Sequence, residues 1–395
     1  MAELVRRGEV EALALTEAAL ERIDAVSLCG VPFLAKDINI EVAGMRLTFS
    51  CRWLESLPPA AMDAPLASRW RAAAAVASGM VPIAHGTDSG GSIRVPAAAC
   101  GLVGLKPSRG WVPTGPYHDE LAGGLDCEHV LARSVRDSAL MLELTCGSWA
   151  GSRTSLPRER FARAVGADVP PLNIAVITAA PGAAPLDEEI GAAVEEVAAH
   201  LSRAGHRVSA AALPSSADIG EAAGILWLTA IAEDLEFYEK RVGRPPEPHE
   251  LEALTWAGVA LGRRSSAIDY VRARRVLTAA TRDMAERFAE FDILLLPTTA
   301  QHAPLTGQID GRTAAFDLGS WTAQSYGYAP YTELFNVTGQ PAVSLPLAVS
   351  RGGLPIGIQF AAPLGADARL IALSAWLECE RPWSDRLRAL RLRLP

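Results

Sequence analysis

A chain of 395 residues with 49% hydrophobic residues can build a sizeable core, as one large domain or as two or three average ones. Its formal net charge of −8 argues against a nucleic-acid-binding surface, because proteins that follow a phosphate backbone gather Lys and Arg. Its 6 cysteines include no CxxC pair, which argues against a disulfide framework and against a zinc site.

The N-terminal segment has the pattern of an amphipathic surface helix over residues 10–26. Leu13, Leu20 and Ile23 recur at helical spacing, with Glu and Arg on the other face. Acidic residues throughout the segment and the lack of an unbroken apolar run argue against a signal peptide and a membrane anchor. We therefore expect a cytoplasmic protein without a membrane partner.

The stretch GVPFLAKDINI, residues 30–40, predicts a buried apolar strand that carries Lys36 near its end. Burying an ammonium group is costly, and the group tends to lose its proton instead. A neutral lysine of this kind can accept a proton near pH 7. The alternative is a strand-end lysine whose ammonium group reaches back to water.

A glycine-rich turn within HGTDSGGSIRVP, residues 85–96, carries the strongest chemical pattern in the chain. Gly90 and Gly91 allow backbone dihedrals closed to other residues, so that consecutive N–H groups can point at one anion. If Ser92 attacks a carbonyl carbon, the N–H groups from Ser89 to Ser92 can stabilise the resulting oxyanion. The alternative is a generic glycine turn with an incidental serine.

The longer stretch GTDSGGSIRVPAAACGLVGLKPS closely resembles the signature of the amidase signature family, serine hydrolases that use a Ser–Ser–Lys triad. The resemblance implies that Ser92 is the acylated nucleophile, with Asp88 and Arg94 as its supporting shell. It also implies that Ser89 to Gly91 supply backbone donors to the oxyanion.

The stretch GVPFLAKDI is similar to the second motif of this family and implies that Lys36 is the base of the triad. The family's middle serine relays the proton from a GGSSGG loop, which this sequence lacks. Ser68 precedes Ser92 by about the family's spacing, but bulky residues at 69–71 stand where the family has glycines. The other explanation is that the segment with the relay serine is absent from the sequence.

Residues 115–133 are expected to form a loop beside the cleft. Their amino-acid sequence resembles that of the branch of the family that includes the 6-aminohexanoate cyclic dimer hydrolases. His118 and His129 lie in this segment. No HExxH or His-x-His pattern is present, so loop histidines are favoured over a metal site or a His-based triad.

The remaining chain predicts an α/β fold. Residues 172–208 alternate strand, helix and strand, which indicates parallel pairing, and the apolar run at 291–297 predicts a central parallel strand. A mainly helical insert is expected at about 216–290, and inserts of this type commonly form one wall of a substrate pocket. We expect one large domain over residues 1–395, a mixed, largely parallel sheet covered by helices, for which the resemblance implies the amidase signature fold.

These residues can hydrolyse a small-molecule amide through a serine acyl-enzyme, without a metal or another cofactor. A Ser–His–Asp esterase is disfavoured because Arg94, not glycine, stands two residues after Ser92. A nucleotide-binding protein is disfavoured because GxxxxGK[ST] and GxGxxG are absent. A non-catalytic binding scaffold is the alternative if the relay serine is missing. A homodimer is compatible with either function.

Overall fold

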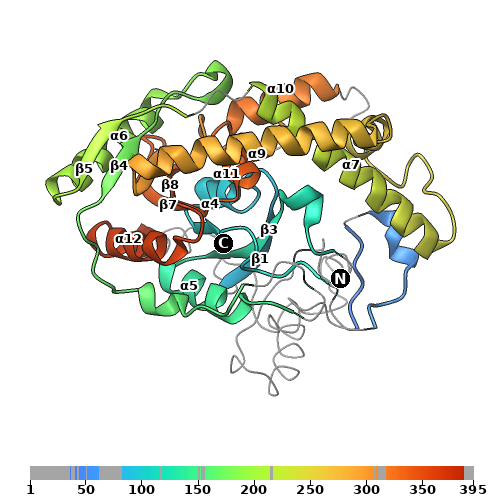
Figure 1. Ribbon diagram of the computed structural model, residues 1–395, viewed down its shortest axis with the longest axis horizontal. Coiled ribbons are helices and arrows are strands. Elements are labelled where there is room, and N and C mark those ends of the chain that lie inside the picture. Colours follow the sequence, from blue (N-terminus) through green and yellow to red (C-terminus); the bar gives the residue numbers. More distant parts are fainter. Residues whose placement is uncertain are drawn as a thin grey trace.

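A mixed eight-stranded sheet runs through the described part of the chain, with helices on both faces (Figure 1). The computed structural model describes residues 36, 41, 44–49, 51–61, 82–115, 118–149, 152, 156–213, 217–305, 308–309 and 317–386. Across the sheet the strands lie in the order β1-β3-β2-β7-β8-β6-β4-β5. Their bounds, in chain order, are β1 (Ile83–Asp88), β2 (Val103–Lys106), β3 (Cys127–Ala132), β4 (Asn173–Val176), β5 (Arg207–Ala210), β6 (Ile293–Pro297), β7 (Ala342–Val349) and β8 (Pro355–Ala361).

Most neighbouring strands are antiparallel, so the expectation of a largely parallel sheet is wrong. Antiparallel pairing joins β1 to β3, β3 to β2, β2 to β7, β7 to β8 and β8 to β6. Only β4 pairs in parallel, with β5 and with β6. The predicted strand–helix–strand unit is therefore confirmed, but its strands β4 and β5 lie at one end of the sheet. The five-residue connection between β7 and β8 requires an antiparallel pair.

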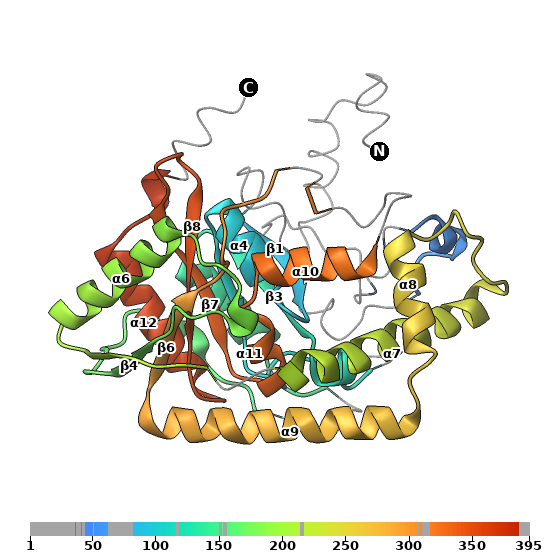
Figure 2. The ribbon, with the colours of Figure 1, turned by 90° about the horizontal axis from the view of Figure 1, so that it is seen from above.

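Helices cover both faces of the sheet (Figures 1 and 2). One face packs against α5 (Val135–Thr145), α6 (Glu188–Arg203) and α12 (Asp367–Glu380). The other packs against α7 (Ala217–Val242), α9 (Ala267–Glu290) and α11 (Glu333–Thr338). The remaining described helices are α4 (Arg94–Cys100), α8 (Ala253–Gly262) and α10 (Leu318–Tyr328), with short 3-10 turns η1 (Arg52–Ser56), η2 (Leu121–Gly124), η3 (Phe161–Ala164) and η4 (Pro181–Ala183). No described helix is both long and apolar enough to cross a membrane.

Strand β6 confirms that the apolar run at 291–297 is a fully buried strand. Ile293 and Leu295 belong to the core on the α6 side, whereas Leu294 and Leu296 belong to the core on the α7 and α9 side. Side chains alternate across a strand, so a strand covered on both faces needs apolar residues at every position. The strand is parallel to β4 and antiparallel to β8.

Helix α4 lies directly on the sheet because glycines stand beneath it. A Cβ atom added at Gly357 in β8 would lie 2.7 Å from Ala98 Cα, and one added at Gly104 in β2 would lie 2.8 Å from the carbonyl oxygen of Ile93. Both contacts are shorter than side-chain packing allows, so the two glycines set the position of α4. Ser92 stands two residues before this helix.

Replacing Gly357 by Ala should lower the free energy of unfolding by about 1–3 kcal/mol, because the added methyl group overpacks the contact with α4. Gly224→Ala is the matched control: it lies in α7 with no neighbouring atom within 4 Å of an added Cβ. This control should gain about 0.5–1 kcal/mol from helix propensity. Urea denaturation measures both, and equal effects of the two substitutions would contradict the assigned packing.

Candidate active site

The turn from Ser89 to Ser92 joins the end of β1 to the start of α4. Its shape is fixed by the carboxylate of Asp88, the last residue of β1. Asp88 Oδ1 accepts a hydrogen bond from Gly91 N–H at 2.8 Å, and Oδ2 accepts one from Ile93 N–H at 3.2 Å. Ser92 is exposed on this turn. A hydroxyl group that the sequence predicts to be a nucleophile is thus accessible from solvent.

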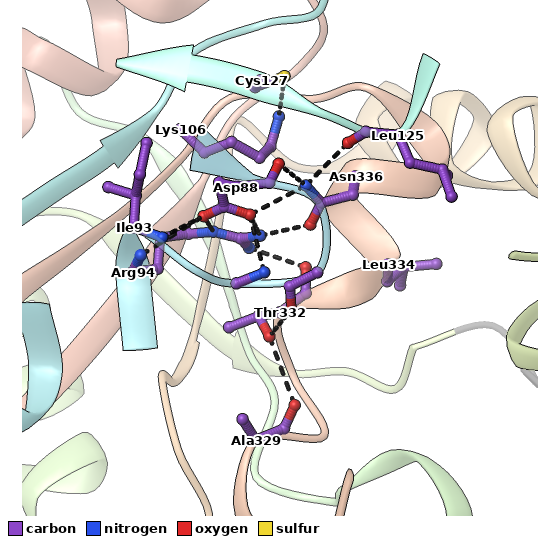
Figure 3. Close-up of polar contacts among 12 residues, drawn as sticks. Asp88, Ile93, Arg94, Lys106, Leu125, Cys127, Ala329, Thr332, Leu334 and Asn336 are labelled. Carbon is purple, nitrogen blue, oxygen red and sulfur yellow. Dashed lines mark hydrogen bonds and ion pairs between the residues drawn. The ribbon is translucent and has the colours of Figure 1, made fainter. Parts of the chain in front are cut away.

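Asp88 forms a fully buried ion pair with Arg94 (Figure 3). Arg94 Nη2 donates to Asp88 Oδ1 at 2.8 Å, and Arg94 Nε donates to Oδ2 at 3.0 Å, so the contact is bidentate. Burial alone would raise the pKa of Asp88, but the Arg94 guanidinium and the Asn336 amide hold it well below its usual range. The carboxylate is therefore charged and able to accept the bonds that shape the turn.

The other donors of Arg94 reach parts of the chain that are distant in sequence. Nη1 donates to the carbonyl oxygen of Thr332 and to Gln359 Oε1 in β8, both at 2.8 Å. Nη2 also donates to Asn336 Oδ1 in α11 at 2.6 Å. Asn336 in turn donates from Nδ2 to the carbonyl oxygen of Asp88 at 2.6 Å (Figure 3). Sequence reasoning did not single out Asn336 or Gln359.

Gly91 occupies a backbone conformation and a space that other residues do not fit. Its φ is +135°, and an added Cβ would lie 2.9 Å from Thr332 Cβ. The Thr332 hydroxyl donates to the Gly90 carbonyl oxygen at 2.5 Å and so fixes the turn from the other side. Gly90 differs, because a Cβ added there would meet no atom within 4 Å. The open side of the turn is therefore at Gly90.

The backbone N–H groups of the turn divide into bonded and available donors. Gly91 N–H donates to Asp88 Oδ1, and its part in an oxyanion hole stays a prediction. Within the described residues, no acceptor is bonded to the backbone N–H groups of Ser89, Gly90 or Ser92.

Lys36 lies against the strand that leads into this turn. Its Nζ donates to Thr87 Oγ1 at 2.6 Å, and its backbone N–H donates to His85 Nδ1 at 3.3 Å. The residue is exposed, so the expectation of a desolvated lysine is wrong for this structure. The apolar stretch before it and the residue Ser68 lie outside the described residues. The structure thus brings Lys36 to β1, which also carries Asp88 and precedes Ser92.

Asp126 is a buried carboxyl group beside the turn, and sequence reasoning did not single it out. The Ser89 hydroxyl forms a hydrogen bond with its side chain. Burial, followed by the neighbouring carboxylate of Glu128, raises the pKa of Asp126 to about 8, although Lys36 opposes the shift. Asp126 also lines a cavity of about 430 Å³, bordered mainly by residues 107–128.

The two histidines of the predicted loop lie in different surroundings. His118 is in a loop, with its ring centroid 6.4 Å from that of Phe237. His129 is a buried residue of β3, so the expectation of a loop histidine is wrong there. Its Nε2 lies 3.0 Å from Ser138 Oγ, and burial lowers its pKa to about 3. Among the described residues, no three His, Cys, Asp or Glu side chains gather as a metal site would require, and every described cysteine is a free thiol.

Replacing Gly91 by Ala should destabilise the protein by about 1–3 kcal/mol and distort the turn, because both its dihedral and its space exclude a side chain. Gly90→Ala, the adjacent control, should leave the free energy of unfolding within about 0.5 kcal/mol of the parent value, as an exposed substitution without new contacts. Urea denaturation of both variants gives the comparison. A Gly91→Ala protein as stable as Gly90→Ala would show that the turn has another shape.

Asp126 should make stability depend on pH. Its folded-state pKa of about 8 lies above the usual value of 3.8 for an aspartic acid side chain, so the folded protein keeps a proton that the unfolded chain releases. This contribution to stability is complete below about pH 4 and is lost as the pH rises to 8, by up to about 1.4 kcal/mol per pH unit. In Asp126→Asn this loss should be absent. Asp283→Asn, an exposed carboxylate in α9, is the control and should follow the parent.

Urea unfolding at pH 5, 6, 7 and 8 measures the effect. If parent and Asp126→Asn lose stability in parallel over this range, Asp126 is ionised throughout and the carboxyl is not held neutral by burial.

Comparisons with known proteins agree with this geometry. A family model described as amidase matches residues 71–371. The 6-aminohexanoate-cyclic-dimer hydrolase of Paenarthrobacter ureafaciens is 31% identical over 482 positions, covering 98% of this chain and 94% of that protein. A putative amidase, AmiC of Mycobacterium tuberculosis, is 35% identical over 332 positions, covering 79% of this chain and 64% of that protein.

Solved structures of amidases have the same fold as this chain. A structure of 6-aminohexanoate cyclic dimer hydrolase has a TM-score of 0.85 at 29% identity, with 98% of this chain and 96% of that chain covered. A bacterial aryl acylamidase of the amidase signature family shares the fold, with a TM-score of 0.81 at 22% identity, covering 100% of this chain and 98% of that chain. Because the alignment with the Paenarthrobacter hydrolase spans 482 positions and this chain has 395 residues, that relative carries residues that this chain lacks. The family model over residues 71–371 and the near-full-length relative at 31% identity show that the chain belongs to the amidase family.

Proposed function

We propose that this amidase-family hydrolase cleaves a carboxylic amide C–N bond through an acyl-enzyme on Ser92. The turn from Ser89 to Ser92 is the observation that carries the proposal. A buried Asp88–Arg94 pair holds the turn, Ser92 is exposed on it, and three of its N–H donors have no acceptor among the described residues. Such a turn suits the attack of a hydroxyl group on a carbonyl carbon and the stabilisation of the oxyanion that forms.

The reaction proceeds in two halves. Ser92 Oγ passes its proton through a relay group to Lys36 in its deprotonated form and attacks the amide carbonyl carbon, and the carbonyl oxygen becomes an oxyanion. The backbone N–H groups of Ser89, Gly90 and Ser92 donate to this oxyanion. The C–N bond then breaks, the leaving amine takes the proton from Lys36, and the acyl group stays on Ser92. Water attacks the ester, and the carboxylic acid is released as Ser92 regains its proton.

The relay between Lys36 and Ser92 is the part of the proposal that lies outside the described residues. Ser68 falls in that part of the chain. The Paenarthrobacter hydrolase carries residues that this chain lacks, which favours the absence of the segment that holds the relay in the family. Transfer through Ser68 and transfer through a water molecule are then the two routes left to this chain. A chain with neither route would be a non-catalytic binding scaffold.

Small linear or cyclic amides are the substrate class that the relatives support. A full-length relative is named for hydrolysis of the 6-aminohexanoate cyclic dimer. We assign the wall of the substrate pocket to the predicted helical insert at 216–290, which forms α7, α8 and α9. The insert approaches the site through η2: a Cβ added at Gly123 would lie 2.6 Å from Leu226 Cδ2 in α7 and 3.1 Å from the Tyr270 hydroxyl in α9.

A serine-directed fluorophosphonate probe should label Ser92 in the parent protein. Ser92→Ala should lose the labelling and lower kcat for amide hydrolysis by about 10⁴–10⁶-fold, as expected when one member of a coupled catalytic unit is removed. Lys36→Ala should lose turnover to a similar extent. Ser202→Ala, on the exposed side of α6, is the matched control and should keep parental labelling and turnover.

Ser68→Ala separates the two routes for the proton. A loss as large as that of Lys36→Ala identifies Ser68 as the relay, and near-parental turnover identifies a water-mediated transfer. Labelling of Ser92→Ala at an equal rate would refute Ser92 as the nucleophile. A parent protein that shows neither labelling nor turnover on any amide would support the scaffold instead.

A further inference from the structure

Strand β1 directs its side chains to two sides, and each side holds a different half of the proposed machinery. Successive side chains of a strand point to opposite faces, so Asp88 projects to one side while Thr87 and His85 project to the other. Asp88 shapes the nucleophile turn. Thr87 and His85 both bond to Lys36, at its ammonium group and at its backbone N–H. The lysine is thus held at both ends by one strand.

His85 makes a second contact that fixes its ring. Its Nε2 lies within hydrogen-bonding distance of Glu128 Oε2 on the neighbouring strand β3. In the sheet register Glu128 is opposite Thr87, so its side chain lies on the same side as Thr87 and His85. His85 is 4% exposed and Glu128 1% exposed. A buried carboxylate next to a buried imidazole leaves the ring one orientation.

The hydrogen bonds also define which ring nitrogen carries the proton. A backbone N–H only donates, so His85 Nδ1 accepts from Lys36 and carries no proton. Nε2 then bears the ring proton and donates it to Glu128. Protonation of Nδ1 would place two donors face to face. Burial, and next the charge of Lys36, lower the pKa of His85 to about 3, in agreement with a neutral ring.

We propose that His85, oriented by Glu128, is a positioning residue that fixes the backbone of Lys36 so that its Nζ reaches Thr87 and the route to Ser92. This inference rests on the proposed function of Lys36 as the base. An exposed lysine has a long, flexible side chain, and contacts must hold it for proton transfer. The Glu128–His85–Lys36 chain provides one such contact from the interior of the protein, and the Thr87 hydroxyl provides the other.

Four substitutions test the two bonds of His85 separately. His85→Asn places an amide oxygen near the position of Nδ1 and can still accept from Lys36 N–H, whereas His85→Gln reaches toward Glu128 but loses that acceptor. Glu128→Gln keeps an acceptor for Nε2–H, and Glu128→Ala removes it. We expect His85→Gln and Glu128→Ala to lower kcat about 10²-fold with KM within about twofold of the parent. Glu128→Gln should keep kcat within about fivefold of it, and His85→Asn, which keeps the acceptor for Lys36 N–H but not the contact with Glu128, should keep a kcat between those of the parent and His85→Gln.

Urea denaturation of the same variants separates positioning from folding. The inference is overturned if His85→Gln keeps parental kcat. It is also overturned if the two His85 variants lose kcat equally, and the two Glu128 variants do as well, in proportion to their loss of stability. If one His85 variant does not fold, the Glu128 pair decides alone. The results also distinguish this inference from the proposed function. If the proposed function is wrong, Lys36→Ala and Ser92→Ala keep turnover. If only this inference is wrong, both of those variants are inactive and His85→Gln keeps parental kcat.

Discussion

The buried ion pair between Asp88 and Arg94 determines the shape of the site, because both partners bond to backbone groups as well as to each other. The carboxylate receives the Gly91 and Ile93 N–H groups, and the guanidinium donates to the Thr332 carbonyl oxygen. Removing one partner of a buried pair leaves an uncompensated charge at a cost of about 3–5 kcal/mol. A turn that exposes Ser92 with its N–H donors therefore depends on charges that solvent does not reach.

Sheet architecture explains how one strand can serve two catalytic groups. Alternation along β1 separates the carboxylate that shapes the nucleophile turn from the residues that contact Lys36. The position of the Asp88 carboxylate and the positions of Thr87 and His85 are therefore fixed by the same strand at the same time. Helix α4 adds a third constraint, because glycines in β2 and β8 let it approach the sheet closely and fix the far end of the turn. Rigid strands and a close helix are the kind of support that a preorganised oxyanion site needs.

The sequence alone predicted the features that depend on neighbouring residues. The turn before α4, the buried strand β6 and the β4-α6-β5 unit all follow from local patterns. The five-residue connection between β7 and β8 was a local sign of antiparallel pairing that the prediction did not use. The pairing of β2 with β7 was missed because it joins residues far apart in the chain, such as Gly104 and Ser344. Asn336 and Gln359 escaped notice for the same reason, since each meets Arg94 across more than 240 residues.

Two errors concern single groups. His129 was assigned to a loop together with the rest of residues 115–133, yet it is a buried residue of β3. Lys36 was expected to be desolvated because it lies in an apolar stretch, but the residue is exposed. Both outcomes depend on which parts of the chain the fold brings next to these residues. The local sequence around each residue does not contain that information.

Rapid-quench mass spectrometry during hydrolysis of a p-nitroanilide of a short carboxylic acid tests the central claim most directly. The account predicts that the peptide containing Ser92 gains the mass of the acyl group while p-nitroaniline is released, and that the adduct disappears as substrate is consumed. Turnover without any covalent adduct, or with the adduct on a peptide that lacks Ser92, would contradict it.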